Sequence, residues 1–295
     1  MNVLVVGGTG FVGERLCTEL LDRGHEVAVL ARHPEDGDLP DGVERVAGDV
    51  TDYDSIESAF EGRDAVYFLP ALSPLFQPRG GNEMHFRVHR DGTANAVRAA
   101  EEHDVDRYVQ MSALGADPDG PTAYIRSKGE AETIVRESDL SWTIFRPSVV
   151  FGEGGEFVSF TLKLTPPVVA PLPGGGKSRF QPIWIGDLTP MLADAIEDDE
   201  HVGATYEIGG PEVLTLADVA KAGREARGQS VTIVPIPMPL AGLGLTIAGA
   251  IPGFPMGADQ YRSLQFDNTV RENEVSAFGV SESELTTLAE YLEID

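Results

Sequence analysis

The stretch Asn2-Val3-Leu4-Val5-Val6-Gly7-Gly8-Thr9-Gly10-Phe11-Val12-Gly13 joins a short apolar run directly to a group of glycines. The run at 2–6 predicts a strand that is buried on both faces, and apolar residues at helical spacing follow at 11–21. A second strand is expected at 25–30. Strand, glycine turn, helix and strand in this order predict a right-handed βαβ unit of the kind that binds dinucleotides.

The glycines at positions 7, 10 and 13 have the spacing GxxGxxG. The first glycine permits a tight turn, the second lets backbone N–H groups approach a pyrophosphate, and the third allows close packing of the helix. A purely structural glycine turn is the alternative, but the loop lies between the first strand and the first helix. We therefore expect cofactor phosphates to contact Gly7, Thr9, Gly10, Phe11, Val12 and Gly13.

Strand and helix patterns alternate through the first half of the chain. Further strands are expected at 43–46, 65–69, 107–111 and 142–145, with helices near 52–60, 84–103 and 121–138. This alternation predicts an α/β fold, a Rossmann-type doubly wound parallel sheet with ligands at the carboxyl ends of its strands.

Prolines and glycines become frequent after Arg146-Pro147, which indicates a smaller carboxyl-terminal substrate lobe. We expect residues 1–150 to form the dinucleotide-binding domain, 181–210 to return to it, and 151–180 and 211–295 to form the lobe. The stretch 237–255 has no charged residue, but prolines and glycines interrupt it. A substrate lid or an apolar surface hairpin is therefore expected there, and no transmembrane span.

Acidic residues outnumber basic ones by 48 to 22, which gives a net charge of −26. This charge repels nucleic acid, so no nucleic-acid partner is expected. Because the chain has only four lysines, its surface resembles an adaptation to high salt; an acidic protein of ordinary habitat is the alternative. Met1 leads straight into an apolar run without a basic region, so we expect no leader peptide and a cytoplasmic location.

Two positions bear on the choice of cofactor. Where an NAD site usually has an acid after the second strand, this chain reads Leu30-Ala31-Arg32-His33. The Arg32 guanidinium can pair with a 2′-phosphate, which favours NADP(H) over NAD(H), although a solvated loop charge is the alternative. Asp49-Val50 follows the third strand and is expected near the adenine, unless Asp49 caps the next helix.

Tyr124 and Lys128 are four residues apart on a predicted helix and so share one face. A lysine ammonium can stabilise a nearby tyrosinate, which makes the tyrosine a usable proton donor. Ser112 stands at the end of a predicted strand and can hydrogen-bond the same substrate oxygen. The YxxxK spacing by itself occurs often by chance.

The runs VLVVGGTGFVG, YVQMSALGA, YIRSKGEAE and TIFRPSVVFG resemble, in order, those of the extended and atypical short-chain dehydrogenases/reductases. FQPIWIGDL and TYEIGGPEVLTLADVA resemble the carboxyl-terminal lobe of that branch, and ADQYRSLQFDN resembles relatives of the nucleotide-binding accessory subunit of respiratory complex I. The resemblance implies that Tyr124 is the general acid/base, that Lys128 binds the nicotinamide ribose and lowers the tyrosine pKa, and that Ser112 orients substrate. Further cofactor contacts are expected from Leu69, Pro70 and Pro147.

Two positions depart from the family pattern. His89 replaces the usual asparagine before Gly92-Thr93, and Ala113 replaces the usual second serine. His85 and His89 lie four apart, but no HExxH glutamate and no third ligand accompany them, so no metal is expected.

Three functions follow from the resemblance. The first is an NADP(H)-dependent oxidoreductase, for which the apolar residues and prolines after Gly152 favour a small, apolar or quinone-like substrate. The second is a non-catalytic NADPH-binding accessory or assembly protein in peripheral contact with a membrane respiratory NADH dehydrogenase complex, because such relatives bind NADPH without evident turnover. A nucleotide-sugar epimerase or dehydratase is disfavoured, since no uridine- or sugar-binding signature is evident.

Overall fold

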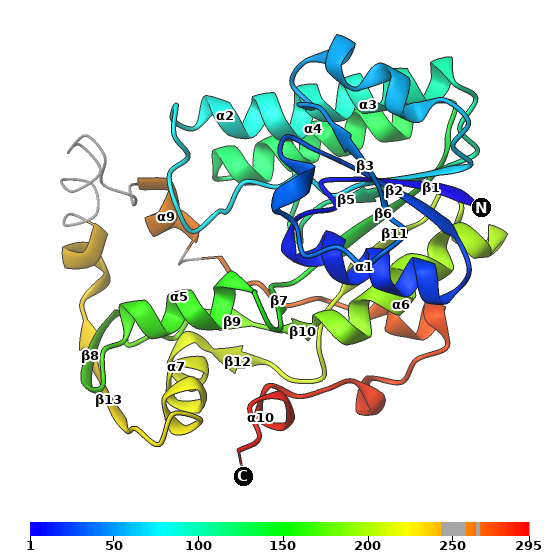
Figure 1. Ribbon diagram of the computed structural model, residues 1–295. Coiled ribbons are helices and arrows are strands. Elements are labelled where there is room, and N and C mark those ends of the chain that lie inside the picture. Colours follow the sequence, from blue (N-terminus) through cyan, green and yellow to red (C-terminus); the bar gives the residue numbers. More distant parts are fainter. Residues whose placement is uncertain (243–257, 264–265, 295) are drawn as a thin grey trace. The chain divides into compact units, whose positions relative to one another are not determined.

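The computed structural model describes residues 1–242, 258–263 and 266–294. The chain forms two compact units, which are drawn in Figure 1. The first unit contains residues 1–72, 78–146 and 188–206, and the second contains 73–77, 147–187 and 207–295.

A seven-stranded sheet in the order β11-β6-β5-β4-β1-β2-β3 forms the centre of the first unit. Its strands are β1 (Asn2–Val6), β2 (Glu26–Ala31), β3 (Glu44–Ala47), β4 (Ala65–Phe68), β5 (Arg107–Met111), β6 (Ser141–Pro147) and β11 (Thr205–Ile208). The pairs from β3 through to β6 are all parallel. The predicted doubly wound α/β fold is confirmed. The strand order reverses between β1 and β4, so ligands are expected at the carboxyl ends of these two strands.

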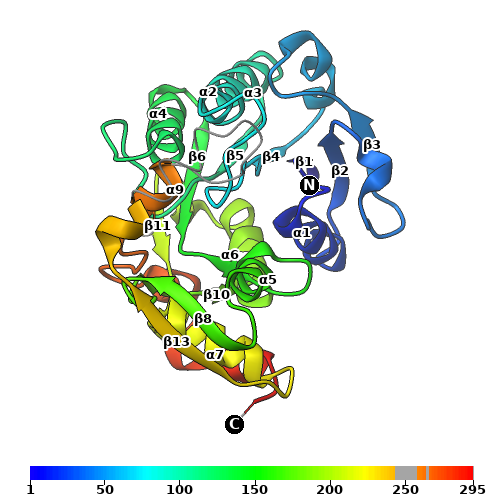
Figure 2. The ribbon, with the colours of Figure 1, turned by 90° about the vertical axis from the view of Figure 1, so that its left-hand side faces the viewer.

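Helices cover both faces of this sheet (Figure 2). One face carries α3 (Gly92–Glu102) and α4 (Ala123–Glu137), and the other carries α1 (Phe11–Asp22) and α6 (Ile185–Glu197). The Tyr67 hydroxyl donates a hydrogen bond of 2.7 Å to the Leu192 carbonyl and so ties β4 to α6. Coverage on both faces explains why the residues of β1 from Val3 to Val6 are fully buried.

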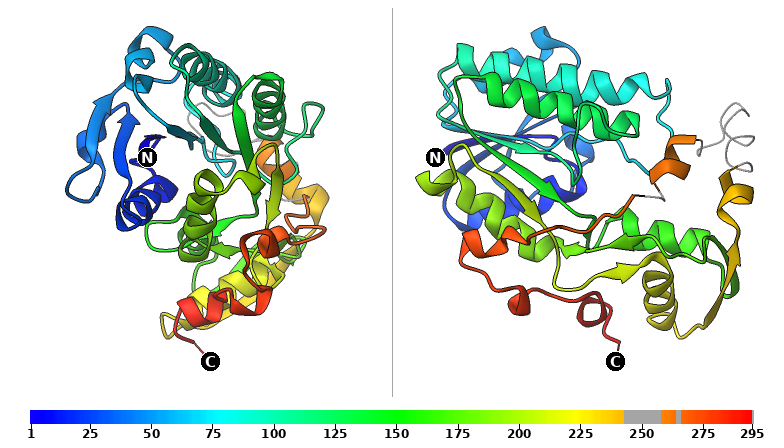
Figure 3. Two further views of the ribbon diagram at one scale, coloured as in Figure 1. Left: turned by 90° about the vertical axis from the view of Figure 1, so that its right-hand side faces the viewer. Right: turned by 180° about the vertical axis from the view of Figure 1, so that it is seen from behind.

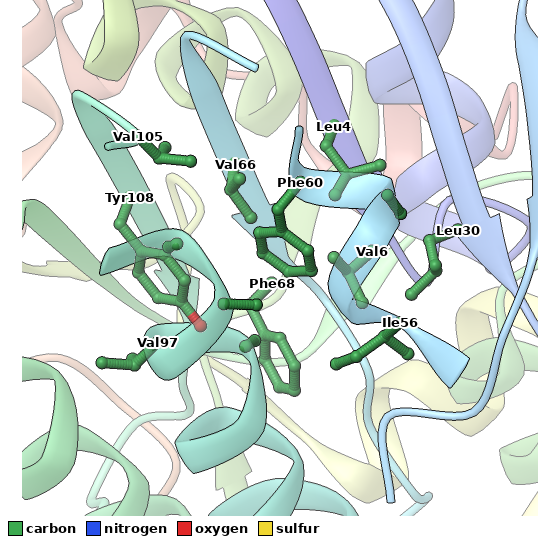
Figure 4. Packing of buried hydrophobic residues seen from close by; sticks show 14 of the residues in the cluster. Leu4, Val6, Leu30, Ile56, Phe60, Val66, Phe68, Val97, Val105 and Tyr108 are labelled. Atoms are coloured by element: carbon green, nitrogen blue, oxygen red, sulfur yellow. The ribbon is translucent and has the colours of Figure 1, made fainter. Parts of the chain in front are cut away.

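A hydrophobic core lies between the sheet and the α3 layer (Figure 4). Side chains from β1, β4 and β5 meet Phe60 and Val97 there, and Phe68 and Tyr108 are fully buried. This core gives the strand ends a rigid support.

The prediction of a helix near 52–60 is wrong. This segment forms two 3-10 turns, Tyr53–Ser55 and Glu57–Phe60. The Ser55 hydroxyl donates to the carbonyls of Asp49 and Asp52, and it accepts from the backbone N–H of Asp49. Such local side-chain bonds compete with the helical backbone pattern. The helix predicted near 84–103 has three parts, namely α2 (Glu83–His85), a π-helical turn (Phe86–Asp91) and α3.

The second unit contains short strands and helices (Figure 3). Three two-stranded sheets pair β7 (Val150–Phe151) with β10 (Ile183–Trp184), β8 (Val168–Pro173) with β13 (Val231–Ile236), and β9 (Arg179–Phe180) with β12 (Leu214–Thr215). The helices described in this unit are α5 (Glu156–Leu164), α7 (Leu216–Glu225), α9 (Ala258–Ser263) and α10 (Leu288–Tyr291). A small core contains Phe151, Phe157, Val219 and Leu288. The remaining 3-10 turns among the described residues are Pro34–Asp36, Asp199–His201, Glu274–Phe278 and Glu282–Glu284.

Most of the apolar stretch 237–255, predicted as a lid or hairpin, lies outside the described residues. Within the described part of the chain, no helix has both the length and the apolar character needed to cross a membrane.

Candidate active site

The glycine loop turns sharply between β1 and α1. Gly7 has a φ of +79°, its N–H donates to the Leu30 carbonyl at 2.8 Å, and its carbonyl accepts from Gly10 N–H at 3.0 Å. A Cβ atom added to Gly13 would lie 2.5 Å from the Cα of Gly8. The helix therefore begins directly against the loop, which only glycine at position 13 allows.

The amino terminus of α1 has the features of an anion site. Gly10 is exposed, it precedes the helix, and no side chain caps it. The first backbone N–H groups of a helix have no acceptor within that helix, and they lie at the positive end of its dipole. A Cβ atom on Gly10 would meet only the Gly7 carbonyl oxygen, at 3.3 Å. The N–H groups of Phe11, Val12 and Gly13 are thus suited to hold a pyrophosphate.

The segment after β4 lies against this loop. The Leu69 N–H donates to the Val6 carbonyl at 3.0 Å, and a Cβ atom on Gly7 would lie 3.2 Å from the Pro70 nitrogen. Leu69 and Pro70 therefore stand beside the glycine turn, at the point where the strand order reverses.

Three other predicted cofactor residues are Thr9 in the glycine loop, Val50 after β3 and Pro147 at the end of β6. Thr9 packs on Gly37, where an added Cβ atom would lie 2.7 Å from the threonine methyl carbon. The carbonyl of Val50, after β3, accepts a hydrogen bond of 2.8 Å from Asn95. Pro147 is buried and is the last residue of β6.

Arg32 immediately follows β2 and is exposed, and no hydrogen bond joins it to another described residue. Asp49 accepts hydrogen bonds from the N–H and hydroxyl of Thr51, at 2.9 and 2.8 Å. Burial raises the pKa of Asp49, but these bonds and the charges of Arg32 and Arg87 outweigh burial and hold the pKa below its usual value. The charges of Arg32 and Arg87 therefore act on the Asp49 carboxylate.

The buried lysine lies at the carboxyl end of the sheet. Thr122 caps α4 by accepting from Ile125 N–H, and this orients the helix that carries Lys128. Lys128 is only 1% exposed, and its Nζ donates to the Met111 carbonyl at 2.8 Å and to the Pro70 carbonyl at 3.5 Å. Burial lowers the pKa of Lys128 to about 8, although the charge of Glu132 opposes this shift.

Tyr124 is half-buried, and its ring packs edge-on against two histidines. The ring centroids lie 5.7 Å from His85 and 5.4 Å from His89. No hydrogen bond joins the phenol hydroxyl to another described residue. Burial raises the pKa of Tyr124 to about 12. The family resemblance implies a tyrosine pKa lowered by Lys128, whereas here the ammonium is directed at two backbone carbonyls.

Ser112 is buried, and its hydroxyl donates to Glu132 Oε1 at 2.5 Å. Glu132 also pairs with Arg146 and Arg136. The serine thus belongs to a buried charged network. Sequence reasoning missed Glu132 and Arg146, although both lie inside the family-like runs YIRSKGEAE and TIFRPSVVFG.

Both histidines beside Tyr124 are buried. The sequence suggested a possible metal pair and showed that His89 replaces the usual asparagine, but the contact of both histidines with the tyrosine was missed. No group of three His, Cys, Asp or Glu side chains suited to a metal occurs within residues 1–242, 258–263 and 266–294.

Residues 7–163, more than half of the chain, match the family described as NAD(P)H-binding. The chain belongs to this family. In this NAD(P)H-binding protein, the glycine loop lies at the amino-terminal edge of the matched region.

Among curated proteins, it is 30% identical over 247 residues to the mitochondrial NADH dehydrogenase [ubiquinone] 1 alpha subcomplex subunit 9 of Arabidopsis thaliana. That match covers 80% of this chain and 60% of the relative. The chain thus spans about three fifths of the length of that complex I subunit. It is also 28% identical to the NAD(P)H azoreductase of Xenophilus azovorans, over 84% of this chain and 81% of the relative.

Among solved structures, it is similar to the UDP-glucose 4-epimerase of Thermus thermophilus in complex with NAD. The TM-score is 0.68 at 26% identity, over 89% of this chain and 99% of the epimerase chain. Together these similarities identify an NAD(P)-binding, atypical short-chain dehydrogenase/reductase with complex I accessory subunits among its relatives.

Proposed function

We propose that the protein is an NADP(H)-dependent reductase that transfers a proton from Tyr124 to its substrate. The observation that supports this most strongly is the position of Tyr124 and Lys128 on one face of α4. The Lys128 ammonium binds the Pro70 carbonyl, and Pro70 packs against Gly7 of the phosphate-binding loop. The proton-handling pair and the cofactor loop therefore share one edge of the sheet.

The cofactor would be held by residues of the first unit. The N–H groups at the start of α1 would bind the pyrophosphate, Asp49 and Val50 would face the adenine, and Arg32 would pair with the 2′-phosphate. Bound NADP(H) supplies or accepts a hydride. Arg32 supports the preference for NADP(H) because its guanidinium is exposed and makes no hydrogen bond with described residues.

The pKa of Tyr124, about 12, supports its role as a proton donor. At neutral pH this phenol is protonated, so it is ready to donate a proton to a substrate oxygen or nitrogen. The reverse reaction would need the phenolate, which burial disfavours. The site therefore starts with the proton in place on Tyr124, as reduction of an acceptor requires.

Lys128 would bind ribose hydroxyls while keeping contact with the backbone. Its pKa of about 8 leaves the amine mostly charged at pH 7. A charged donor on the same face of α4 as Tyr124 would stabilise negative charge as the phenol loses its proton.

The substrate class proposed is an apolar acceptor, such as a quinone or an azo compound. The azoreductase relative supports this class, because the match covers most of both chains. The many prolines and apolar residues after Gly152 also favour it over a nucleotide sugar.

The test is NADPH oxidation with menadione and with an azo dye, in the wild type and in Tyr124→Phe. We expect Tyr124→Phe to lower kcat by about 100-fold, because general acid catalysis contributes this much. The Kd for NADPH should stay within about twofold, since the variant keeps the ring. Turnover equal to that of the wild type would refute the role of Tyr124.

Cofactor preference is tested separately by calorimetry with NADPH and NADH. Arg32→Gln should weaken NADPH binding by about tenfold or more and leave NADH binding unchanged, because only NADPH has the 2′-phosphate. Arg227→Gln, an exposed arginine after α7, is the matched control. Equal affinity of the wild type for both cofactors would contradict the role of Arg32.

A second candidate function is a non-catalytic NADPH-binding accessory protein of a respiratory complex. The engagement of the Ser112 hydroxyl by Glu132 and the complex I relative favour it. In that case NADPH would stabilise the fold against heat, no acceptor would be reduced, and the protein would co-purify with respiratory subunits.

A further inference from the structure

The imidazole of His89 bridges two segments that are distant in sequence. It is fully buried in the π-helical turn, and its Nε2 lies 2.9 Å from the backbone nitrogen of Leu72. A backbone N–H can only donate, so Nε2 must accept and carries no proton. The ring proton therefore resides on Nδ1, which lies 2.9 Å from the Ser127 hydroxyl oxygen.

The bridge continues into the helix that carries Tyr124. The buried Ser127 hydroxyl accepts from His89 and donates its own proton to the Tyr124 carbonyl at 2.9 Å. Donors and acceptors alternate without conflict from Leu72 through His89 and Ser127 to Tyr124. We call this series the His89 bridge.

The surroundings keep the imidazole neutral. Burial lowers the pKa of His89 well below its ordinary value, and the charges of Lys128 and His85 act in the same direction. Tyr124 is the other titratable group beside the ring, and it is uncharged at neutral pH. A second ring proton would sit on Nε2 and would therefore remove the acceptor of the Leu72 N–H.

We propose that His89 is a positioning residue that fixes the segment at 70–72 against α4. Lys128 holds the same segment through the Pro70 carbonyl, and Pro70 rests on Gly7. Loss of the His89 bridge would let this segment move relative to Tyr124 and Lys128. The consequence would be a slower proton transfer, while the phosphate-binding loop itself remains intact.

Two variants separate the hydrogen bonds from the ring. His89→Phe keeps a ring beside Tyr124 but loses both hydrogen bonds. His89→Gln loses the ring but offers an amide oxygen to Leu72 and an amide N–H to Ser127. The role assigned to His89 rests on the proposed function, so the first readout is the reduction of menadione by NADPH.

We expect His89→Phe to lower kcat by about tenfold. The Leu72 N–H would lose its acceptor, and a tenfold change in rate corresponds to the typical cost of one buried donor left unpaired. His89→Gln should restore kcat to within about threefold of the wild type, and both variants should keep the Kd for NADPH within about threefold. A merely structural role would instead impair both variants alike in stability and affinity. Unchanged kcat in His89→Phe would overturn the proposal.

Nuclear magnetic resonance of the wild type tests the bridge without activity. Imidazole nitrogen shifts should identify a neutral ring protonated at Nδ1 from pH 5.5 to 8, and the Leu72 amide should exchange slowly with solvent. If His89→Phe does not fold, Ser127→Ala replaces it and should speed exchange of the Leu72 amide. A ring protonated at Nε2, or fast exchange in the wild type, would overturn the bridge.

Failure of the proposed function and failure of the His89 bridge give different results. A wild type that reduces no acceptor refutes the proposed function, but the ring tautomer and the Leu72 exchange rate still test the bridge. A wild type that reduces menadione with the wrong tautomer refutes the bridge alone.

Discussion

The carboxylate of Glu132 receives two hydrogen bonds from the Arg146 guanidinium, at 2.8 and 2.6 Å. Glu132 is 1% exposed, so this pair joins α4 to β6 inside the protein. The same carboxylate accepts from the Ser112 hydroxyl at the end of β5. One buried charge thus links the helix of Tyr124 and Lys128 to two neighbouring strands.

Glu132→Gln should destabilise the protein by about 3 kcal/mol, because breaking a buried ion pair leaves the arginine without its counter-charge. Chemical denaturation at constant salt measures the change. Glu137→Gln is the control, since Glu137 is exposed on the same helix and its loss should cost less than about 0.5 kcal/mol. Equal effects of the two substitutions would contradict a structural role for the buried pair.

The lowered pKa of Lys128 predicts that the free energy of unfolding depends on pH. Its pKa is about 8 in the folded protein and 10.5 ordinarily, so between these values the unfolded chain binds more protons than the folded protein. The free energy of unfolding should therefore rise from pH 8 to 10.5, by roughly 3 kcal/mol relative to Lys128→Met. Denaturation of both proteins across this range measures the difference. Parallel stability curves would contradict a lowered lysine pKa.

Two glycines of the loop should respond differently to alanine. A Cβ atom on Gly13 would collide with Gly8, so Gly13→Ala should destabilise the fold by about 1–3 kcal/mol. Gly10 has a φ of −86°, which any residue can adopt, and its added Cβ would lie 3.3 Å from the Gly7 carbonyl oxygen, so Gly10→Ala should lower the Tm much less than Gly13→Ala. Its methyl group would nevertheless stand where the pyrophosphate approaches, and NADPH affinity should fall by about tenfold or more. Thermal unfolding and calorimetry distinguish the two effects, and unchanged NADPH affinity in Gly10→Ala would place the phosphates elsewhere.

The net charge of −26 predicts a requirement for salt. At low ionic strength the carboxylates repel one another, and salt screens this repulsion within a few ångströms. The Tm should therefore fall as KCl is lowered from about 2 M to 0.05 M, by about 2–4 °C for each kcal/mol of stability lost. A Tm that does not depend on salt would favour an acidic protein of ordinary habitat.

Local patterns predicted most of the first unit. The strand at 2–6 and the helix from Phe11 are visible in the sequence, because buried parallel strands are continuously apolar and helices repeat every 3.6 residues. The segment 52–60 was mispredicted, because the hydrogen bonds of Ser55 to Asp49 and Asp52 depend on the actual turn. Side-chain bonds of this kind leave no periodic signal.

The glycine loop, the missing acid beside Arg32 and the spacing of Tyr124 and Lys128 on one helix were determined by the sequence alone, because each depends on residue type and short spacing. Only the tertiary structure decided what surrounds them. It turned Ser112 towards Glu132, buried Lys128 on two carbonyls, and placed His89 between Leu72 and Ser127. These contacts join residues 17 to 58 positions apart, and the lowered pKa values of Lys128 and His89 arise from burial, which exists only once the chain is packed.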